Sequence, residues 1–304
     1  MVDLELGPLR FGVVGAGRLG IVLARSLQQA GFELVAASSA TPVGCARASQ
    51  ALGIPVFSHD ALVLHEIDVA LICVPDDAIA ATAHELAQLH EQSLAGLRVV
   101  HTSGCVSLNA LSPLADLGAD TLSLHPLQTI TRTSTPADLR GAAAAVTASS
   151  TATRTFGHAL AHAVGMTPFD LEDAARPLYH VASTFAANFT VTLLAAARDA
   201  CRAAGVDEHV SRHAFASLAR SAAHRVEQDG PEAALTGPIV RGDIGTLQHH
   251  LAVLDAHLPE LAELYRGLAT ATTQLAAAGG HLTPTAVESF SAAIAPPAPA
   301  SSGA

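Results

Sequence analysis

Three glycines near the start of the chain limit its fold more than any other feature. Gly15, Gly17 and Gly20 follow an apolar run at residues 9–14 and precede a stretch with helical spacing at residues 21–30. In the pattern Gly-x-Gly-x-x-Gly, the first glycine permits a tight turn, the second lets the backbone approach a phosphate, and the third lets helix and strand pack closely. The pattern therefore predicts a strand, a tight turn and a helix whose N-terminus faces negative charge.

The rest of the chain has one part with alternating strands and helices and another part with helices alone. Apolar runs typical of strands lie at residues 32–37, 67–74, 97–101, 122–124 and 142–148, and helical spacing recurs at residues 77–90. This alternation predicts a parallel, doubly wound sheet covered on both faces. Long helical runs follow at residues 173–204, 208–229, 243–257 and 259–278.

These patterns predict an α/β fold with two domains, for which a chain of 304 residues is long enough. We expect a Rossmann-type dinucleotide-binding domain over residues 1–170 and an all-helical substrate and dimerisation domain over residues 171–295. The last residues, 296–304, are of low complexity, and we expect them to form a disordered tail.

The end of the second strand indicates which dinucleotide the glycine motif binds. An acidic side chain at that point would hold the two ribose hydroxyls of NAD. Residues 35–41 read Val-Ala-Ala-Ser-Ser-Ala-Thr, so no carboxylate is there to repel a 2′-phosphate. Ser38 and Ser39 can donate hydrogen bonds to that phosphate, and Arg18 or Arg47 can supply charge. We expect NADP as the cofactor, with NAD as the second choice and with purely turn-forming serines as the alternative interpretation.

The ends of two later strands complete the predicted cofactor site, because strand C-termini line the ligand crevice in such sheets. Val74-Pro75 and Ser103-Gly104 each follow an apolar run. The residues expected to contact the cofactor are Gly15, Ala16, Gly17, Arg18, Leu19, Gly20, Ser38, Ser39, Val74, Pro75, Ser103 and Gly104.

The composition excludes several classes of chemistry. All 16 basic residues are Arg, and the chain contains no Lys. Mechanisms that need a lysine ammonium, such as Schiff-base formation, are therefore closed to this chain, and Arg cannot replace Lys as a proton donor because it stays protonated. A net charge of −11 disfavours binding to nucleic acid. The acidic start is unlike a signal peptide and no cysteine pair has CxxC spacing, so we expect a cytoplasmic protein without a metal site.

One uncharged stretch, residues 177–197, is long enough to cross a bilayer. It carries seven polar side chains that would be costly against lipid, namely Tyr179, His180, Ser183, Thr184, Asn188, Thr190 and Thr192. We therefore expect a buried helix, and no membrane partner, with the polar stripe facing other polar groups. The stretch suits either the seam of a homodimer or the core of a monomer.

Five segments of the sequence together resemble one family. They are residues 12–20 (GVVGAGRLG), 73–79 (CVPDDAI), 101–104 (HTSG), 124–128 (LHPLQ) and 236–243 (TGPIVRGD). The family is that of the Rossmann-like proteins with the domain of unknown function 2520, which are described as NADP oxidoreductases. They are similar in plan to 6-phosphogluconate dehydrogenase, ketopantoate reductase and pyrroline-5-carboxylate reductase. The resemblance covers about residues 9–290. It implies a helical C-terminal domain, like that of 6-phosphogluconate dehydrogenase, which closes over the nicotinamide and often forms a dimer.

The resemblance also indicates where a substrate is handled. In the β-hydroxyacid dehydrogenase relatives, the first long helix carries a Lys and an Asn that contact the substrate oxygen; here the Lys is missing, and Asn188 stands as an orienting residue. His180 on the same helix is one candidate acid, because histidine changes charge near neutral pH. The alternative is a core histidine. Ser183 shares a face with His180, whereas Asn188 is displaced around the helix. His125 is the competing donor and is similar to the His-Pro step of prephenate dehydrogenases.

A loop at residues 236–243 supplies a candidate for binding a substrate carboxylate. Arg241 can hold a carboxylate through two parallel hydrogen bonds, or it can pair with Asp243, which would then cap the next helix; both roles are compatible. The sequence therefore predicts an NAD(P)-dependent oxidoreductase that reduces a small carboxylate-bearing carbonyl compound, with a ketopantoate-like 2-oxo acid as the first choice. The alternatives are a cyclic-imine reductase of the pyrroline-5-carboxylate type and a non-catalytic dinucleotide-binding sensor or scaffold.

Overall fold

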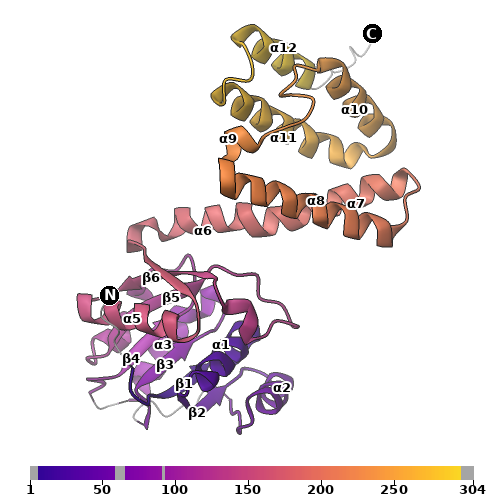
Figure 1. Ribbon diagram of the computed structural model, residues 1–304. Coiled ribbons are helices and arrows are strands. Elements are labelled where there is room, and N and C mark those ends of the chain that lie inside the picture. The colour runs from indigo at the N-terminus through magenta and orange to yellow at the C-terminus, as the bar shows by residue number, and fades with distance from the viewer. Residues whose placement is uncertain (1–5, 59–65, 91–92, 296–304) are drawn as a thin grey trace, which may run out of the picture. The chain divides into compact units, whose positions relative to one another are not determined.

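The computed structural model describes residues 6–58, 66–90 and 93–295 (Figure 1). The expected tail at residues 296–304 lies outside the described residues. The chain forms two compact units, residues 1–187 and residues 188–304. The sequence placed the change of character near residue 170, at the start of the first long helical run.

The first unit contains a sheet of seven strands in the order β2-β1-β3-β4-β5-β6-β7 (Figure 1). The strands are β1 (Arg10–Val14), β2 (Glu33–Ser38), β3 (Val69–Ile72), β4 (Arg98–His101), β5 (Asp120–Pro126), β6 (Ala143–Ala148) and β7 (Thr167–Asp170). All neighbouring pairs are parallel except β5 and β6, which are antiparallel. The Rossmann-type fold is therefore confirmed, but the expectation of a wholly parallel sheet is wrong at β6, and β7 was not predicted.

The direction of β6 follows from the segment that precedes it. A parallel crossover needs a dozen or more residues and usually a helix. The connection from β5 to β6 contains a single 3₁₀ turn at Pro136–Leu139 and no α-helix among its residues, all of which are described. The sequence of β6 itself, Ala-Ala-Ala-Val-Thr-Ala, is equally compatible with either direction.

Helices cover both faces of the sheet, as a doubly wound fold requires. The α-helices that begin in the first unit are α1 (Arg18–Gln29), α2 (Pro42–Leu52), α3 (Ile79–Gln88), α4 (Ser112–Ala115), α5 (Thr151–Ala163) and α6 (Arg176–Thr184), the last of which has one buried residue, Arg176. Val13 packs in the core that contains Leu23 of α1 and Leu160 of α5, whereas its neighbour Val14 packs in the core that contains Ile79 of α3. Successive side chains of a strand point to opposite faces, so both faces are buried.

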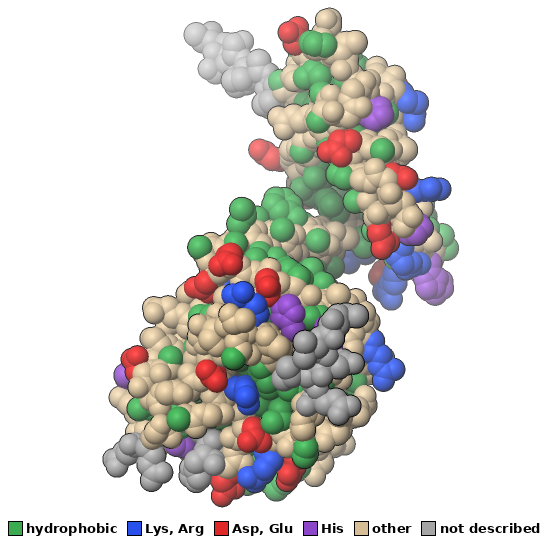
Figure 2. All heavy atoms as spheres, turned by 60° about the vertical axis from the view of Figure 1, so that its left-hand side comes forward, with side chains coloured by type: hydrophobic (Ala, Val, Ile, Leu, Met, Phe, Trp, Pro, Cys, Tyr) green, Lys and Arg blue, Asp and Glu red, His purple; other side chains and the backbone are tan. Residues whose placement is uncertain are grey.

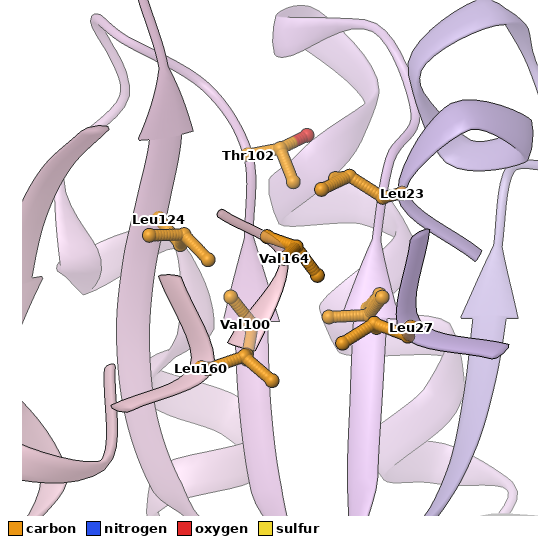
Figure 3. Close-up of a pocket in the computed structure, with 8 residues that line it drawn as sticks. Leu23, Leu27, Val100, Thr102, Leu124, Leu160 and Val164 are labelled. Carbon is orange, nitrogen blue, oxygen red and sulfur yellow. The ribbon is translucent and has the colours of Figure 1, made fainter. Parts of the chain in front are cut away.

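The core on the α1 and α5 side is filled. Its lining side chains, among them Leu23, Leu124, Leu160 and Val164, converge on a cavity of about 10 Å³ (Figure 3). A volume of that size is about the minimum for one water molecule, so this space holds no substrate or cofactor.

The second unit is helical, as expected. Its helices are α7 (Thr190–Ala203), α8 (Glu208–Asp229), α9 (Pro231–Ala234), α10 (Ile244–His257), α11 (Pro259–Ala278) and α12 (Pro284–Ile294). Their core includes Leu247, Leu251, Ala276 and Phe290. The long helical runs predicted from the sequence correspond to α7, α8, α10 and α11, whereas α9 and α12 were not predicted.

A helix over Asp173–Ala203 corrects one expectation from the sequence. It consists of α6, a π-helical segment at Phe185–Phe189, and α7. Its length and the mean hydropathy of 1.3 in its most apolar part would suit a membrane span, but no residue of that part is buried in the single chain. Leu178 and Phe185 are 76% and 63% exposed, and hydrophobic side chains reach the surface seen in Figure 2. The prediction of a buried helix is therefore wrong for the single chain, because hydropathy marks an apolar face without identifying what covers it.

Candidate functional site

Two of the three motif glycines are required by the fold itself. Gly15 has a φ of +86°, and a Cβ there would lie 2.8 Å from Cγ1 of Val74. The backbone N–H groups of Gly15 and Ala16 both donate to the carbonyl of Ser38, at 3.2 and 2.7 Å, which ties the loop to the end of β2. A Cβ on Gly20 would lie 2.5 Å from the carbonyl oxygen of Gly15. Any side chain at either position would displace backbone.

The glycine at position 17 has no such reason within the protein. A Cβ on Gly17 would meet its nearest atom, the carbonyl oxygen of Gly15, at 3.9 Å, an ordinary contact. Its backbone is extended, and it precedes α1, which has no side-chain cap and no acidic residue in its first turn. Arg18 is exposed at the start of the same helix. This helix terminus therefore offers backbone donors, a cation and room for a close approach, which fits a pyrophosphate.

The turn after β2 carries no carboxylate, and its polar side chains differ in whether they have a hydrogen-bond partner. Thr41 accepts a hydrogen bond from the N–H of Gly44 at 3.0 Å and caps α2. Ser39 is nearly buried, and its carbonyl accepts a hydrogen bond from the thiol of Cys45. Ser38 is 1% exposed, and its hydroxyl has no hydrogen-bond partner among the described residues. Thr41 is thus a turn-forming residue, whereas the Ser38 hydroxyl, beside the glycine loop, has a free hydrogen-bonding capacity within the described residues.

The polar groups of Ser103 are used to build the loop after β4. Its hydroxyl accepts hydrogen bonds from the N–H groups of Cys105 and Val106 at 3.1 and 3.0 Å. Its own N–H donates to Nδ1 of His101 at 3.3 Å, and its carbonyl accepts a hydrogen bond from the hydroxyl of Ser123 at 3.3 Å. Ser103 therefore shapes the loop that presents Gly104.

The two histidines proposed as competing donors flank Gly104. A Cβ on this glycine would lie 2.9 Å from Nε2 of His125 and 3.0 Å from Cδ2 of His180. His125 comes from β5 and His180 from α6, and their ring centroids are 6.4 Å apart. The fold thus brings together two imidazoles that are far apart in the sequence, at positions 125 and 180.

A third side chain, that of Tyr179, joins this cluster. The sequence did not single it out as a functional group. The hydroxyl of Tyr179 lies 2.8 Å from Nδ1 of His125, and the two rings meet edge to face at 87°. Phe169 of β7 packs against the other side of the phenol, with ring centroids 6.0 Å apart. The signal that could have found Tyr179 is its place beside His180 in a chain that has two tyrosines.

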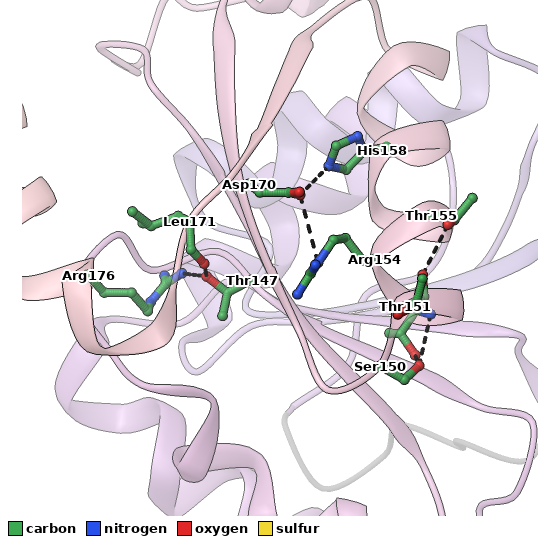
Figure 4. A network of polar contacts seen from close by, with 10 residues as sticks. Thr147, Ser150, Thr151, Arg154, Thr155, His158, Asp170, Leu171 and Arg176 are labelled. Atoms are coloured by element: carbon green, nitrogen blue, oxygen red, sulfur yellow. Dashed lines mark hydrogen bonds and ion pairs between the residues drawn. The ribbon is translucent and has the colours of Figure 1, made fainter. Parts of the chain in front are cut away.

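Arg176 fixes the start of α6 against the loop after β4. Its side chain is fully buried. Nε donates to the carbonyl of Val106 at 2.7 Å, Nη1 donates to Oγ1 of Thr147 at 2.9 Å (Figure 4), and Nη2 donates to the carbonyl of Ser103. Asp173, one turn earlier, accepts hydrogen bonds from the hydroxyl of Ser107 and the N–H of Leu108. These contacts hold the first turn of α6, and with it the next side chains, against the sheet.

Burial sets the protonation of the cluster. Burial, with smaller contributions from the nearby Arg176 and His180, lowers the pKa of His125 to about 4. Burial also raises the pKa of Tyr179, although the Ser183 hydroxyl and Arg176 act in the opposite direction. His101, which is fully buried, has its pKa lowered to about 3 by the same desolvation. At neutral pH the site therefore holds a neutral imidazole at His125 and a protonated phenol at Tyr179.

Ser183 and Asn188 lie further along the same Asp173–Ala203 helix as His180. The hydroxyl of Ser183 donates to the carbonyl of Tyr179 at 3.1 Å, within its own helix. Asn188 is exposed, belongs to the second unit and lies in the π-helical segment. A π-helical turn is wider than an α-helical one, so an ideal helical wheel does not give the direction of Asn188.

Arg241 is exposed in the second unit, after the turn at Gly237. Asp243 accepts hydrogen bonds from the N–H and the hydroxyl of Thr246 at 3.0 and 2.7 Å, which confirms its role as the cap of α10. The same bonds, with Arg241 as a smaller contributor, lower the pKa of Asp243.

Other ionisable side chains form ion pairs or are buried, and they lie outside the histidine cluster. His158 and Arg154 of α5 both contact Asp170 of β7, at 2.7 and 3.8 Å (Figure 4). Burial raises the pKa of Cys73 to about 12, so its thiol stays protonated. Within residues 6–58, 66–90 and 93–295 there is no group of three His, Cys, Asp or Glu side chains placed to hold a metal ion.

The glycine loop, the doubly wound sheet and the helical second unit define a Rossmann-type protein with a helical C-terminal part. Residues 2–126 match the Rossmann-like domain, and residues 142–272 match the domain of unknown function 2520. The chain therefore carries a match to the Rossmann-like domain followed by a match to the domain of unknown function 2520.

Solved structures share this fold. A protein from Bacteroides fragilis, described as a candidate NADP oxidoreductase, is 23% identical over 88% of this chain and 98% of its own, with a TM-score of 0.75. A protein from Thermotoga maritima is 18% identical over 88% and 98% of the two chains, with a TM-score of 0.66. The pyrroline carboxylate reductase of Plasmodium falciparum, solved with NADP bound, is 13% identical over 95% and 100%, with a TM-score of 0.58. No curated protein matches the chain.

Proposed function

We propose that this protein is an NADP-dependent oxidoreductase that reduces a small carbonyl compound bearing a carboxylate. One observation carries the proposal: the fold leaves room for a side chain at Gly17, yet the position is occupied by glycine, at an uncapped helix terminus. A glycine that the fold does not need is explained by a ligand that needs the space, and a dinucleotide pyrophosphate is the ligand that such a terminus binds.

The preference for NADP rests on charge. β2 ends at Ser38, and the turn that follows contains no Asp or Glu to bind the ribose hydroxyls of NAD. Arg18 at the start of α1 and Arg47 in the middle of α2 are both exposed, and each can supply charge to a 2′-phosphate.

The proposed reduction needs a hydride and a proton. The bound nicotinamide would supply the hydride. The proton would come from the cluster at Gly104, where His125 and His180 are the two candidate donors. Ser183 and Asn188 are proposed to orient the substrate oxygen, and Arg241 to hold its carboxylate through a bidentate contact.

The first choice of substrate is a 2-oxo acid such as ketopantoate, and the second is a cyclic imine. The second choice is favoured by the fold shared with a pyrroline carboxylate reductase and by the absence of Lys, because an iminium arrives already protonated and needs no protein acid. A sensor that binds the dinucleotide without turnover is the remaining alternative.

Titration of the purified protein into NADPH and into NADH tests the proposal. We expect NADPH to bind at least about tenfold more tightly, a difference of about 1.4 kcal/mol. The chain has no Trp, so the nicotinamide fluorescence can be followed without interference. Arg18→Gln should reduce the preference, whereas Arg25→Gln, an exposed arginine further along α1, should leave it unchanged. Binding of neither nucleotide contradicts the proposal, and binding without turnover of any oxo acid or imine favours the sensor.

We also propose that the protein is a homodimer in which a second copy covers the apolar face of the Asp173–Ala203 helix. Leu178, Val181, Phe185 and Phe189 follow one another at intervals of three or four residues and are 46–76% exposed. A stripe without charges can pair with its own copy about a two-fold axis without electrostatic repulsion. Sedimentation equilibrium should show a dimer, and Val181→Glu should shift it to the monomer. A wild-type protein that stays monomeric at the highest concentration measured overturns this proposal.

A further inference from the structure

We propose that Tyr179 acts through His125 as the source of the proton in the proposed reduction, with Arg176 placed to stabilise the phenolate that results. The inference rests on the proposed function. His125 would touch the substrate and deliver its Nε2 proton, and Tyr179 would be a positioning residue that sets the tautomer of His125 and replaces the proton. The juxtaposition of Gly104, His125, Tyr179 and Arg176 carries the proposal.

The hydrogen bond between Tyr179 and His125 decides which ring nitrogen faces the substrate. Oη of Tyr179 and Nδ1 of His125 are 2.8 Å apart. If the phenol donates this hydrogen bond, a neutral imidazole must carry its single proton on Nε2. The alternative, in which Nδ1 donates to the phenol oxygen, would leave Nε2 without a proton to give.

Gly104 lies directly beside Nε2 of His125. A Cβ at this position would lie 2.9 Å from both Nε2 and Cε1 of His125. The missing side chain therefore provides the space in which a substrate oxygen could approach that nitrogen. Such space is of use if Nε2 has a proton to donate, which is the tautomer that the phenol imposes.

The proton transfer balances in atoms and charge. The Nε2–H bond of His125 breaks and an O–H bond forms on the substrate oxygen, while the substrate carbon receives the hydride of the dihydronicotinamide. The phenolic O–H bond of Tyr179 breaks, and its proton moves to Nδ1. The imidazole ends neutral, with the other nitrogen protonated, and the charge left behind is a phenolate on Tyr179, which water later protonates. An imidazolate is avoided, because the phenol is the far stronger acid of the two.

The positive charge of Arg176 acts on the phenol of Tyr179 and lowers its pKa. Arg176 is three residues before Tyr179 on α6, fully buried, and donates its hydrogen bonds to three neutral acceptors. A buried cation bonded to neutral groups is stabilised when a negative charge forms nearby. The other charged or titratable groups that act on this cluster are Asp76, His101, Cys105, Asp173 and His180.

The chain contains a second tyrosine in nearly the same pairing. Oη of Tyr265 lies 2.8 Å from Nδ1 of His250, and their rings meet at 86°. This pair belongs to the second unit, whereas the Tyr179 pair belongs to the first. Because the chain has two tyrosines, Tyr265→Phe is a matched control for Tyr179→Phe.

The first test reads the tautomer and needs neither cofactor nor substrate. Nitrogen-15 NMR of the full-length protein at pH 7 should show His125 as the neutral tautomer protonated on Nε2, with its signals assigned by their loss in His125→Gln. Tyr179→Phe should abolish the preference for this tautomer, and Tyr265→Phe should leave it intact. A wild-type His125 protonated on Nδ1, or a Tyr179→Phe variant with an unchanged His125, overturns the proposal.

The second test separates this inference from the proposed function. With NADPH and a panel of 2-oxo acids and cyclic imines, Tyr179→Phe should lower kcat by about 100-fold or more. Its Kd for NADPH should stay that of the wild type, and Tyr265→Phe should retain full turnover. If the wild type turns over and Tyr179→Phe matches it, the proton source is wrong and the oxidoreductase stands. If the wild type does not bind NADPH, the oxidoreductase fails, and with it the role in proton supply, whatever tautomer His125 adopts.

Discussion

Replacement of Arg176 by Met is expected to lower the free energy of unfolding by about 3–5 kcal/mol. The substitution keeps a long side chain in the core but removes three hydrogen-bond donors, so the carbonyls of Ser103 and Val106 and the hydroxyl of Thr147 each lose a partner. Each buried group left unsatisfied costs about 1–3 kcal/mol. Equilibrium unfolding in urea, followed by circular dichroism, measures the loss.

Arg154→Met is the matched control, because Arg154 is also an arginine of the first unit that contacts a neighbouring element (Figure 4). Its ion pair with Asp170 is 3.8 Å long and exposed on both sides, and such pairs contribute at most about 1 kcal/mol. Arg176→Lys should recover little, since an ammonium cannot reach three separated acceptors in one plane. An Arg176→Met variant as stable as Arg154→Met would show that the three contacts do not hold the loop.

Much of the fold follows from local sequence. The apolar run before Gly15 contains Val13 and Val14, which pack in different cores on opposite faces of the sheet. A strand that is buried on both faces has consecutive apolar residues, and the sequence shows this directly. The direction of β6 does not follow, since it depends on the connection from β5, which contains no α-helix, and not on the residues of the strand. β7 was missed because its sequence, Thr-Pro-Phe-Asp, lacks the apolar run that is typical of a strand. It also lies at the edge of the sheet, where a strand need not be apolar.

The candidate site could be predicted in part. The glycine loop is a local motif, and His125 and His180 stand out by chemistry, but nothing in the sequence shows that they flank the same glycine. The sequence around Arg176 does not show that this side chain is buried, because its burial depends on acceptors from the distant loop after β4 and from β6. The π-helical segment at Phe185–Phe189 displaces Asn188 from its ideal position, which no spacing rule anticipates.

Gly17→Ala is expected to weaken NADPH binding at least about tenfold while leaving the fold intact. The protein has room for the methyl group, whose nearest neighbour would be 3.9 Å away. The exchange of Gly for Ala at a helix N-cap costs about 1 kcal/mol or less, so the unfolding transition should move only slightly. Fluorescence titration with NADPH, alongside urea unfolding of the same preparation, measures both effects.

Gly20→Ala provides the contrast that makes the first result interpretable. Its Cβ would lie 2.5 Å from the carbonyl oxygen of Gly15, so the loop must shift and both stability and NADPH binding should fall. A loss of binding in Gly17→Ala with unchanged stability would assign the glycine to the ligand, because the fold alone gives it no purpose. Unchanged binding in a stable Gly17→Ala protein would mean that no phosphate approaches this helix terminus, and the dinucleotide site would have to lie elsewhere or not exist.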